Sequence, residues 1–192
     1  KLPAWNRNWG ASYTHESRRR LKKNAALRKK GQTVSANIHE QIGSVLGRIP
    51  SGCSILTATA GTRSTGILAS WIQQASFEPP LLTVCVKKGR PIEQIIDQSG
   101  RFVINVLGDE AREMFKHFAK GFELDELAFE GLATKTVASG VVVDKCLGYL
   151  GCKVAQKVDV GDHNLYVGEV IEAASHSDSD AYIHTRKTGF SY

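Results

Sequence analysis

Hydroxyl and amide side chains gather in the stretch GILASWIQQAS, which runs from residue 66 to residue 76. If this stretch is one strand, side chains alternate between its two faces, and Ser70, Gln74 and Ser76 share a face. Such groups on the rim of a barrel can hydrogen-bond a flat heteroaromatic ligand through its carbonyl and N–H groups. A polar strand surface that faces solvent would look the same, so the residue types leave both interpretations open.

A basic turn follows the next apolar stretch. Lys87, Lys88 and Arg90 stand just before Pro91, a residue that favours the first turn of a helix. Cationic side chains beside the N–H groups of a helix N-terminus can bind a phosphate. The alternative is an ordinary basic turn that binds nothing.

A histidine lies in the stretch GDHNLYVGEV, directly after the expected hairpin turn at Gly161 and Asp162. His163 is well placed to orient a second ligand if the site holds a cofactor. A histidine in this position can equally be a structural or surface residue.

Several standard sites are missing from the sequence. There is no G-x-G-x-x-G after a strand, no G-x-x-x-x-G-K-[ST] and no G-x-S-x-G, and the stretch GTRSTG lacks the lysine of a phosphate loop. The four cysteines form no C-x-x-C pair and are expected to be buried reduced thiols. A disulfide or metal site from Cys146 and Cys152 is a minor alternative, and we expect no metal site.

The composition favours one globular core with an extension. The chain has 192 residues, a net charge of +6, 42% hydrophobic and 23% charged residues, and no apolar run long enough for a membrane helix. Much of the positive charge lies in residues 18–30, which favours a solvated helix or linker over a nucleic-acid or membrane surface. The absence of an initiator Met and of an apolar leader suggests a piece of a longer protein.

The pattern of apolar residues predicts a mainly β domain with flanking helices. Residues 1–36 are expected to be a basic extension with a helix that ends at Gly31, and residues 37–192 the domain. Helical spacing of Ile38, Ile42 and Val45 predicts a helix up to Pro50 that packs on the core. Strands are expected at 54–60, 66–76, 81–87, 101–107, 146–160, 164–175 and 181–187, and helices at 91–100 and, capped by Asp109, at 109–120. Residues 121–145 receive no assignment, and the order favours an antiparallel barrel or an α+β sandwich.

These stretches together resemble the flavin reductase-like family of FMN-binding split barrels. The resemblance covers about residues 38–192 and rests on five ordered matches, IPSGCSILTA, GILASWIQQASFEPPLLTVCVKKGRPI, GRFVINVL, GDHNLYVGEV and YIHTRKTGF. The segment GILASWIQQASFEPP is similar to the corresponding segment of the C-terminal flavin reductase-like domain of flavodiiron proteins of cyanobacteria and photosynthetic eukaryotes. In those proteins a diiron domain and a flavodoxin-like domain precede it.

The resemblance implies an antiparallel Greek-key barrel that binds FMN, usually as a homodimer, and whose flavin is reduced by NADH or NADPH. By position, Ser70, Trp71 and Gln74 would line the isoalloxazine, and Ala69 would add backbone contacts. The flavin phosphate would lie at Lys87, Lys88 and Arg90. The nicotinamide would stack near His163, the expected catalytic residue, and Arg186 would complete the pocket.

The resemblance also implies a place in electron transport. Electrons would pass from the nicotinamide through FMN to the diiron and flavodoxin-like domains in oxygen reduction, in the cytoplasm or the chloroplast stroma. One alternative is an FMN module reduced by a protein donor such as ferredoxin, which a basic extension would suit. Another is a structural domain with a degenerate flavin pocket, since Leu68 and Trp71 stand where many family members have small hydroxyl residues. No nucleic acid and no membrane insertion are expected.

Overall fold

The computed structural model of the protein describes residues 35–109 and 111–191. These residues belong to two compact units. Ile49–Thr185 form the larger unit, and the described parts of Lys1–Arg48 and Arg186–Tyr192 form the smaller one. The expected helix that ends at Gly31 lies outside the described residues, and the domain boundary expected at residue 36 stays a prediction.

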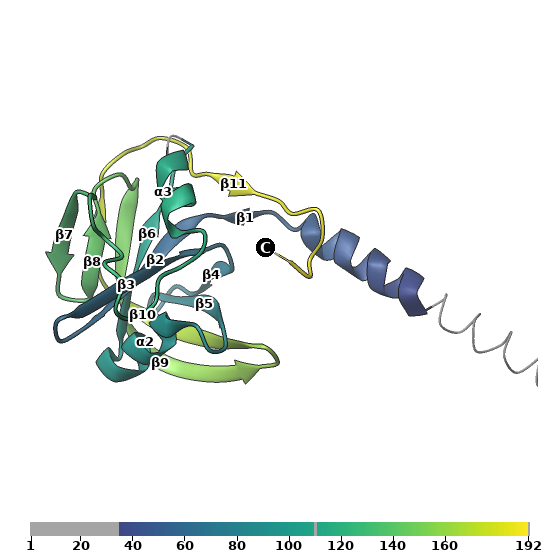
Figure 1. Cartoon of the computed structure of the whole chain (residues 1–192), viewed down its shortest axis with the longest axis horizontal. Coiled ribbons are helices and arrows are strands. Elements are labelled where there is room, and N and C mark those ends of the chain that lie inside the picture. The colour runs from purple at the N-terminus through teal and green to yellow at the C-terminus, as the bar shows by residue number, and fades with distance from the viewer. Residues whose placement is uncertain (1–34, 110, 192) are drawn as a thin grey trace, which may run out of the picture. The chain divides into compact units, whose positions relative to one another are not determined.

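A seven-stranded antiparallel sheet, in the order β3-β2-β6-β9-β10-β5-β4, is the centre of the larger unit (Figure 1). Its strands are β2 (Ser54–Ala60), β3 (Arg63–Ala69), β4 (Ile72–Ser76), β5 (Leu81–Lys87), β6 (Arg101–Val106), β9 (Gly148–Val160) and β10 (His163–Ser175). β3 and β4 are the two edges of this order, yet only Ser70 and Trp71 separate them in the chain. Because three residue steps span at most about 11 Å, the sheet curls until its edges approach each other at this link. The fold is therefore the expected mainly β split barrel.

Two short helices and two small sheets complete the larger unit. Helix α2 (Pro91–Ser99) begins with a proline at its first position and ends at Gly100, whose φ of 64° is the left-handed conformation that glycine adopts readily. Helix α3 is Arg112–Phe118. The small sheets pair β1 (Ser51–Gly52) with β11 (Ile183–His184) and β7 (Thr134–Val137) with β8 (Gly140–Val143).

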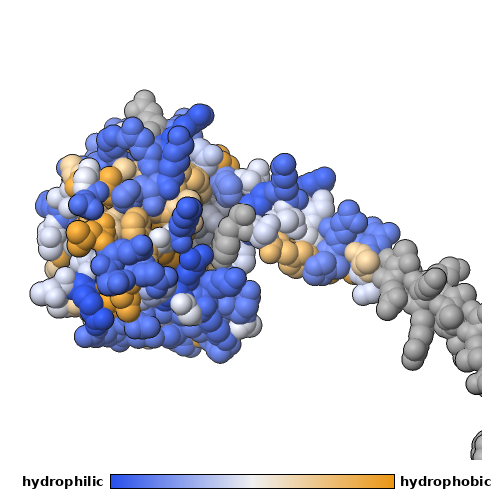
Figure 2. Space-filling model, viewed as in Figure 1, coloured by the Kyte–Doolittle hydropathy of each residue, from blue (hydrophilic) through white to orange (hydrophobic). Residues whose placement is uncertain are grey.

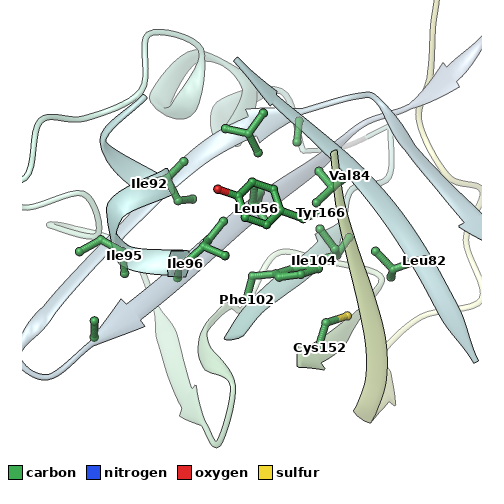
Figure 3. Close-up of a cluster of buried hydrophobic side chains, with 14 residues drawn as sticks. Leu56, Leu82, Val84, Ile92, Ile95, Ile96, Phe102, Ile104, Cys152 and Tyr166 are labelled. Carbon is green, nitrogen blue, oxygen red and sulfur yellow. The ribbon is translucent and has the colours of Figure 1, made fainter. Parts of the chain in front are cut away.

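The central strands are buried on both faces, because each face of the sheet has its own apolar cluster. On β2, Leu56 faces the cluster inside the barrel and Ile55 faces the other cluster. The inner cluster packs side chains of α2 against the barrel strands (Figure 3), and its labelled members are Leu56, Leu82, Val84, Ile92, Ile95, Ile96, Phe102, Ile104, Cys152 and Tyr166. The outer cluster joins Met114 and Phe118 of α3 to β2, β6 and β8. This double burial explains why SILTATA lacks the polar alternation of a half-exposed strand.

A buried amide attaches the β7–β8 hairpin to the barrel. The Asn105 side chain on β6 is fully buried, and its Oδ1 accepts a hydrogen bond from the Val143 N–H (2.9 Å). Its Nδ2 donates to the carbonyls of Ile55 (3.1 Å) and Val141 (3.5 Å). The Thr57 hydroxyl donates to the same Val141 carbonyl. These bonds give the hairpin a fixed register on the outer face of the sheet.

The structure corrects several of the expected elements. The strand expected at 66–76 is two strands, since Ser70 and Trp71 lie outside both β3 and β4. Asp109 does not cap α3, which begins at Arg112 after Ala111. The unassigned segment 121–145 contains the β7–β8 hairpin, and the last strand is only Ile183–His184. The expected hairpin turn at Gly161 is confirmed, with φ 76° at the glycine between the two longest strands.

A helix over residues 35–47 forms most of the described part of the smaller unit. The Gly189 N–H donates to the Gly43 carbonyl (2.6 Å), and the Phe190 ring stacks on His39 with the centroids 4.1 Å apart. Ile38, Ile42 and Val45 are 53%, 46% and 63% exposed, and hydrophobic surface is visible along this helix in Figure 2. The helix is present as expected, and its packing on the core stays a prediction because it belongs to the other compact unit.

All four cysteines are free thiols. Cys53, Cys146 and Cys152 are buried, and Cys85 is half-buried. Burial raises the pKa of Cys53 to about 11 and that of Cys152 to about 12. Cys146 and Cys152 belong to different apolar clusters, and the disulfide between them that stood as a minor alternative does not form. None of the helices in the described residues is long and apolar enough to cross a membrane.

Candidate functional site

The link between β3 and β4 brings the first group of expected site residues to one end of the barrel. Ala69 is buried at the last position of β3, and Ser70 and Trp71 are half-buried. The Trp71 carbonyl accepts a hydrogen bond from the N–H of Cys85 on β5 (3.0 Å). This bond holds the link against β5, although Ser70 and Trp71 have left the ladder.

Gln74 lies farther along the edge strand β4, opposite Leu82. It is exposed, and its Nε2 is 3.5 Å from the Ser76 carbonyl, a weak contact. Leu82 and Lys87 are five residues apart on β5, which corresponds to about 16 Å along a strand. Gln74 is therefore well removed from the basic loop, and the single polar face expected across Ser70, Gln74 and Ser76 does not form.

The basic loop from Lys87 to Arg90 is attached to the β9–β10 turn. The Lys88 N–H donates to the Asp162 carbonyl (3.0 Å). The Lys88 ammonium donates to Asp159 Oδ2 (2.7 Å) and to the Gly161 carbonyl (2.6 Å). This hydrogen bond and charge lower the pKa of the Asp159 carboxyl. The loop and the turn therefore form one continuous surface.

The other two cations of the loop take different directions. Lys87 is the exposed last residue of β5 and lies opposite His163 in the β5–β10 ladder. Arg90 is the residue that precedes α2, and its Nη1 donates to the carbonyl of Lys120 (3.1 Å). Arg90 thus connects the loop to the segment after α3, while Lys87 stays at the turn.

His163 is the buried centre of this cluster, with 5% exposure. Its Nδ1–H donates to Asp162 Oδ1 (2.8 Å), and this bond lowers the pKa of the Asp162 carboxyl. The Trp71 ring lies over the imidazole, with the centroids 4.7 Å apart and the planes tilted by 33°. The histidine is therefore held from one side by a carboxylate and covered on another by an indole.

A network that sequence reasoning missed lies beneath the loop. Glu93 on α2 is 8% exposed, and its Oε2 accepts the Gly89 N–H (2.7 Å) while its Oε1 accepts the Asn164 Nδ2–H (2.6 Å). The Tyr166 hydroxyl, whose pKa burial raises to about 12, donates to Asp97 Oδ1 (3.1 Å). A glutamate at the third position of a helix that begins with proline is the signal that could have revealed it.

The structure thus brings Trp71, Lys87, Lys88 and His163 together. Ser70 directly precedes Trp71, and Arg90 lies two residues after Lys88. Arg186 belongs to the smaller unit, where its N–H donates to the Gly47 carbonyl (2.8 Å). Its role at this site stays a prediction. Within the part of the chain that the structure describes, no three His, Cys, Asp or Glu side chains form a group that could hold a metal ion.

Comparison with known proteins identifies the family to which the chain belongs. The family described as "Flavin reductase like domain" matches residues 46–190, three quarters of the chain. The chain belongs to the flavin reductase-like family. The match includes the β3–β4 link, the basic loop and the β9–β10 turn.

Curated relatives of this flavin reductase-like chain include diflavin flavoproteins of cyanobacteria. Diflavin flavoprotein A 1 of Synechocystis sp. is 34% identical over 159 residues, which cover 81% of this chain and 28% of that protein. The chain spans about a quarter of the length of the curated relatives it matches, with 25% and 26% for two others. It is therefore similar to one part of these longer flavoproteins.

Solved structures of flavin reductases share the fold. The NADH:FAD oxidoreductase SgcE6 of Streptomyces globisporus has a TM-score of 0.69 at 23% identity, over 74% of this chain and 86% of that one. BorF, the flavin reductase component of a bacterial two-component tryptophan halogenase, has a TM-score of 0.67 at 22% identity, over 74% and 90%. At these identities the likeness shows the split-barrel fold.

Proposed function

We propose that this domain binds FMN and transfers electrons from NADH or NADPH through it. The observation that carries the proposal is the convergence of a basic loop, a carboxylate-held histidine and the β3–β4 link at one end of the barrel. Two findings support a flavin as the ligand: the chain belongs to the flavin reductase-like family, and its relatives include proteins named diflavin flavoproteins. In the longer protein, the electrons would pass to a flavodoxin-like and diiron core in oxygen reduction.

The donors at this end of the barrel fit the phosphate ester of FMN. Lys87 is exposed, and the Lys88 side chain is 37% exposed although its ammonium contacts Asp159. Together with Arg90 they place three cationic side chains on one short loop before a helix. Such a loop favours an anion with several oxygen acceptors.

Each residue of the site then has a definite task. Lys87, Lys88 and Arg90 bind the phosphate, Ser70 and Gln74 offer polar groups to the ring edge, and the backbone at Ala69 bounds the site. Bound FMN supplies an acceptor for the hydride of the nicotinamide. His163, oriented by Asp162, positions the nicotinamide, since hydride transfer needs the two rings in near contact.

The visible spectrum of the purified protein tests the proposal. After addition of FMN and desalting, we expect the protein to retain yellow colour that bleaches anaerobically with NADH or with NADPH. Loss of all flavin on desalting, with no binding detected by titration, would contradict the proposal and favour a structural domain. A variant without the three cations should bind riboflavin and FMN with more similar affinities than the original chain.

Replacement of His163 by alanine tests the nicotinamide position. With FMN saturating, we expect kcat/KM for the nicotinamide to fall by about fivefold, chiefly through KM, because a positioning contact is lost. Steady-state assays with His176→Ala as the matched control measure this, since His176 lies outside the site against Tyr149. An unchanged KM and kcat in His163→Ala would remove this role.

A second candidate function is an FMN module that a protein donor such as ferredoxin reduces. The Trp71 ring over His163 favours it, because the indole occupies space beside the expected nicotinamide position. This function would be identified if the protein retains FMN that does not bleach with either nicotinamide but bleaches rapidly with reduced ferredoxin.

We further propose that the protein is a homodimer, which light scattering tests. We also propose that it is located in the cytoplasm or the chloroplast stroma.

A further inference from the structure

We propose that Glu93 is a positioning residue, which fixes the shape of the loop Lys87–Arg90 so that this loop discriminates phosphorylated flavin from flavin without a phosphate. The inference rests on the proposed function, because it assumes that the loop binds the FMN phosphate. It concerns a residue that lies beneath the loop and to which the proposed function assigns no contact with the ligand. Glu93 therefore acts through its neighbours.

The contacts of Glu93 join three segments of the proposed site. One carboxylate oxygen accepts the Gly89 N–H inside the loop, at 2.7 Å. The other accepts the Asn164 amide at 2.6 Å, on the residue next to His163. Glu93 itself belongs to the first turn of α2. One side chain thus holds the loop, the helix and the start of β10 in a fixed relation.

The burial of Glu93 makes its carboxylate depend on hydrogen-bond donors supplied by the protein. A buried carboxylate needs hydrogen-bond donors on both oxygens, and here both oxygens have one. Hydrogen bonds to a charged acceptor are stronger than neutral ones, so they restrict the conformations of the loop more tightly. Gly89 has φ 81° and is exposed, so little else among the described contacts of that residue fixes its N–H.

Asp97 provides a matched comparison on the same helix. It joins the same helix to β9 and β10, through Lys157 (2.7 Å) and the Tyr166 hydroxyl (3.1 Å). Its hydrogen bonds in the described part of the chain go to Lys157 and Tyr166 rather than to the loop, and it lies one helical turn farther from Arg90. The Asp97 side chain is 48% exposed, and the Tyr166 hydroxyl that it accepts also contacts Glu93 Oε1 (3.5 Å). Asp97→Leu therefore measures the loss of an acidic contact from α2 to β10 that has no bond to the loop.

The experiment measures the dissociation constants of FMN and of riboflavin for four forms of the chain by flavin fluorescence quenching. The forms are the original chain, Glu93→Leu, Glu93→Gln and Asp97→Leu. We expect Glu93→Leu to lower the preference for FMN over riboflavin by about fivefold or more, while riboflavin affinity changes little. Glu93→Gln should retain most of the preference, because its amide oxygen accepts the Gly89 N–H and its NH₂ donates to a flipped Asn164 amide.

The outcomes separate this inference from the proposed function. If the original chain binds no FMN, or binds FMN no more tightly than riboflavin, the proposed phosphate site is wrong and the inference fails with it. If the original chain prefers FMN and Glu93→Leu keeps that preference, only the inference fails. An equal loss in Asp97→Leu also overturns it. Should Glu93→Leu not fold by circular dichroism, Glu93→Asp carries the test, since a shorter carboxylate cannot reach both donors.

Discussion

Replacement of Asn105 by leucine should lower the free energy of unfolding by about 3 kcal/mol. Leucine has a similar volume, so the main effect is the loss of hydrogen bonds. The Val143 N–H loses its acceptor, and the Ile55 and Val141 carbonyls lose a donor. The site is fully buried, so water cannot replace the missing partners. Urea denaturation followed by circular dichroism measures the change.

Gln156→Leu is the control for this experiment. Gln156 is an exposed amide on β9, and the same chemical change there should alter the free energy of unfolding by less than about 0.5 kcal/mol. A loss below about 1 kcal/mol in Asn105→Leu would mean that the β7–β8 hairpin is not held by this amide. Proteolysis within residues 134–143 of Asn105→Leu would add that the hairpin opens locally.

Replacement of Trp71 by serine should raise kcat/KM for NADH or NADPH by about tenfold, which corresponds to about 1.4 kcal/mol in the transition state. The reason is steric. The indole lies over the imidazole of His163 at a centroid distance of 4.7 Å. A nicotinamide that stacks beside His163 must displace this ring, and serine removes the obstacle.

Stopped-flow reduction at saturating FMN separates the possible results of this substitution. Trp71→Phe keeps a ring over His163 and should behave like the original chain, within about threefold. A lower kcat/KM in Trp71→Ser, with FMN still bound, would show that the indole assists the nicotinamide. FMN affinity is measured in parallel, so that weaker flavin binding is not mistaken for slower reduction.

Much of the fold follows from local sequence pattern, and the errors have physical causes. Runs such as LLTVCVK are apolar and β-branched, and they form β5 as expected. The stretch 66–76 is divided because β3 pairs with β2 while β4 pairs with β5, so the chain must cross between sheet edges at Ser70 and Trp71. The spacing of apolar residues within 66–76 does not reveal this crossing, because strand pairing is a long-range property. The helix over residues 35–47 forms where the spacing of Ile38, Ile42 and Val45 predicts it.

The candidate site was predictable where residues lie close in sequence or in register. Lys87 and His163 are far apart in the chain, but they end and begin adjacent strands, and the resemblance pointed to both. The contacts of Lys88 with the β9–β10 turn could not be predicted from the sequence, because they depend on where β9 ends and β10 begins. Glu93 was overlooked because a lone acidic residue in a helix is usually a solvated one, and its burial depends on the tertiary packing of α2.

The reactivity of the buried thiols toward alkylating reagents can report local unfolding of this domain. Alkylating reagents attack the thiolate, and at pH 8 a thiol with a pKa of about 11 is ionised in only about one molecule in a thousand. Cys53 precedes β2, Cys146 precedes β9 and Cys152 lies within β9, and all three are buried. We therefore expect each thiol to react chiefly after the segment around it has opened. Because the three thiols report on different regions, the order in which they are modified would trace the sequence of local unfolding events.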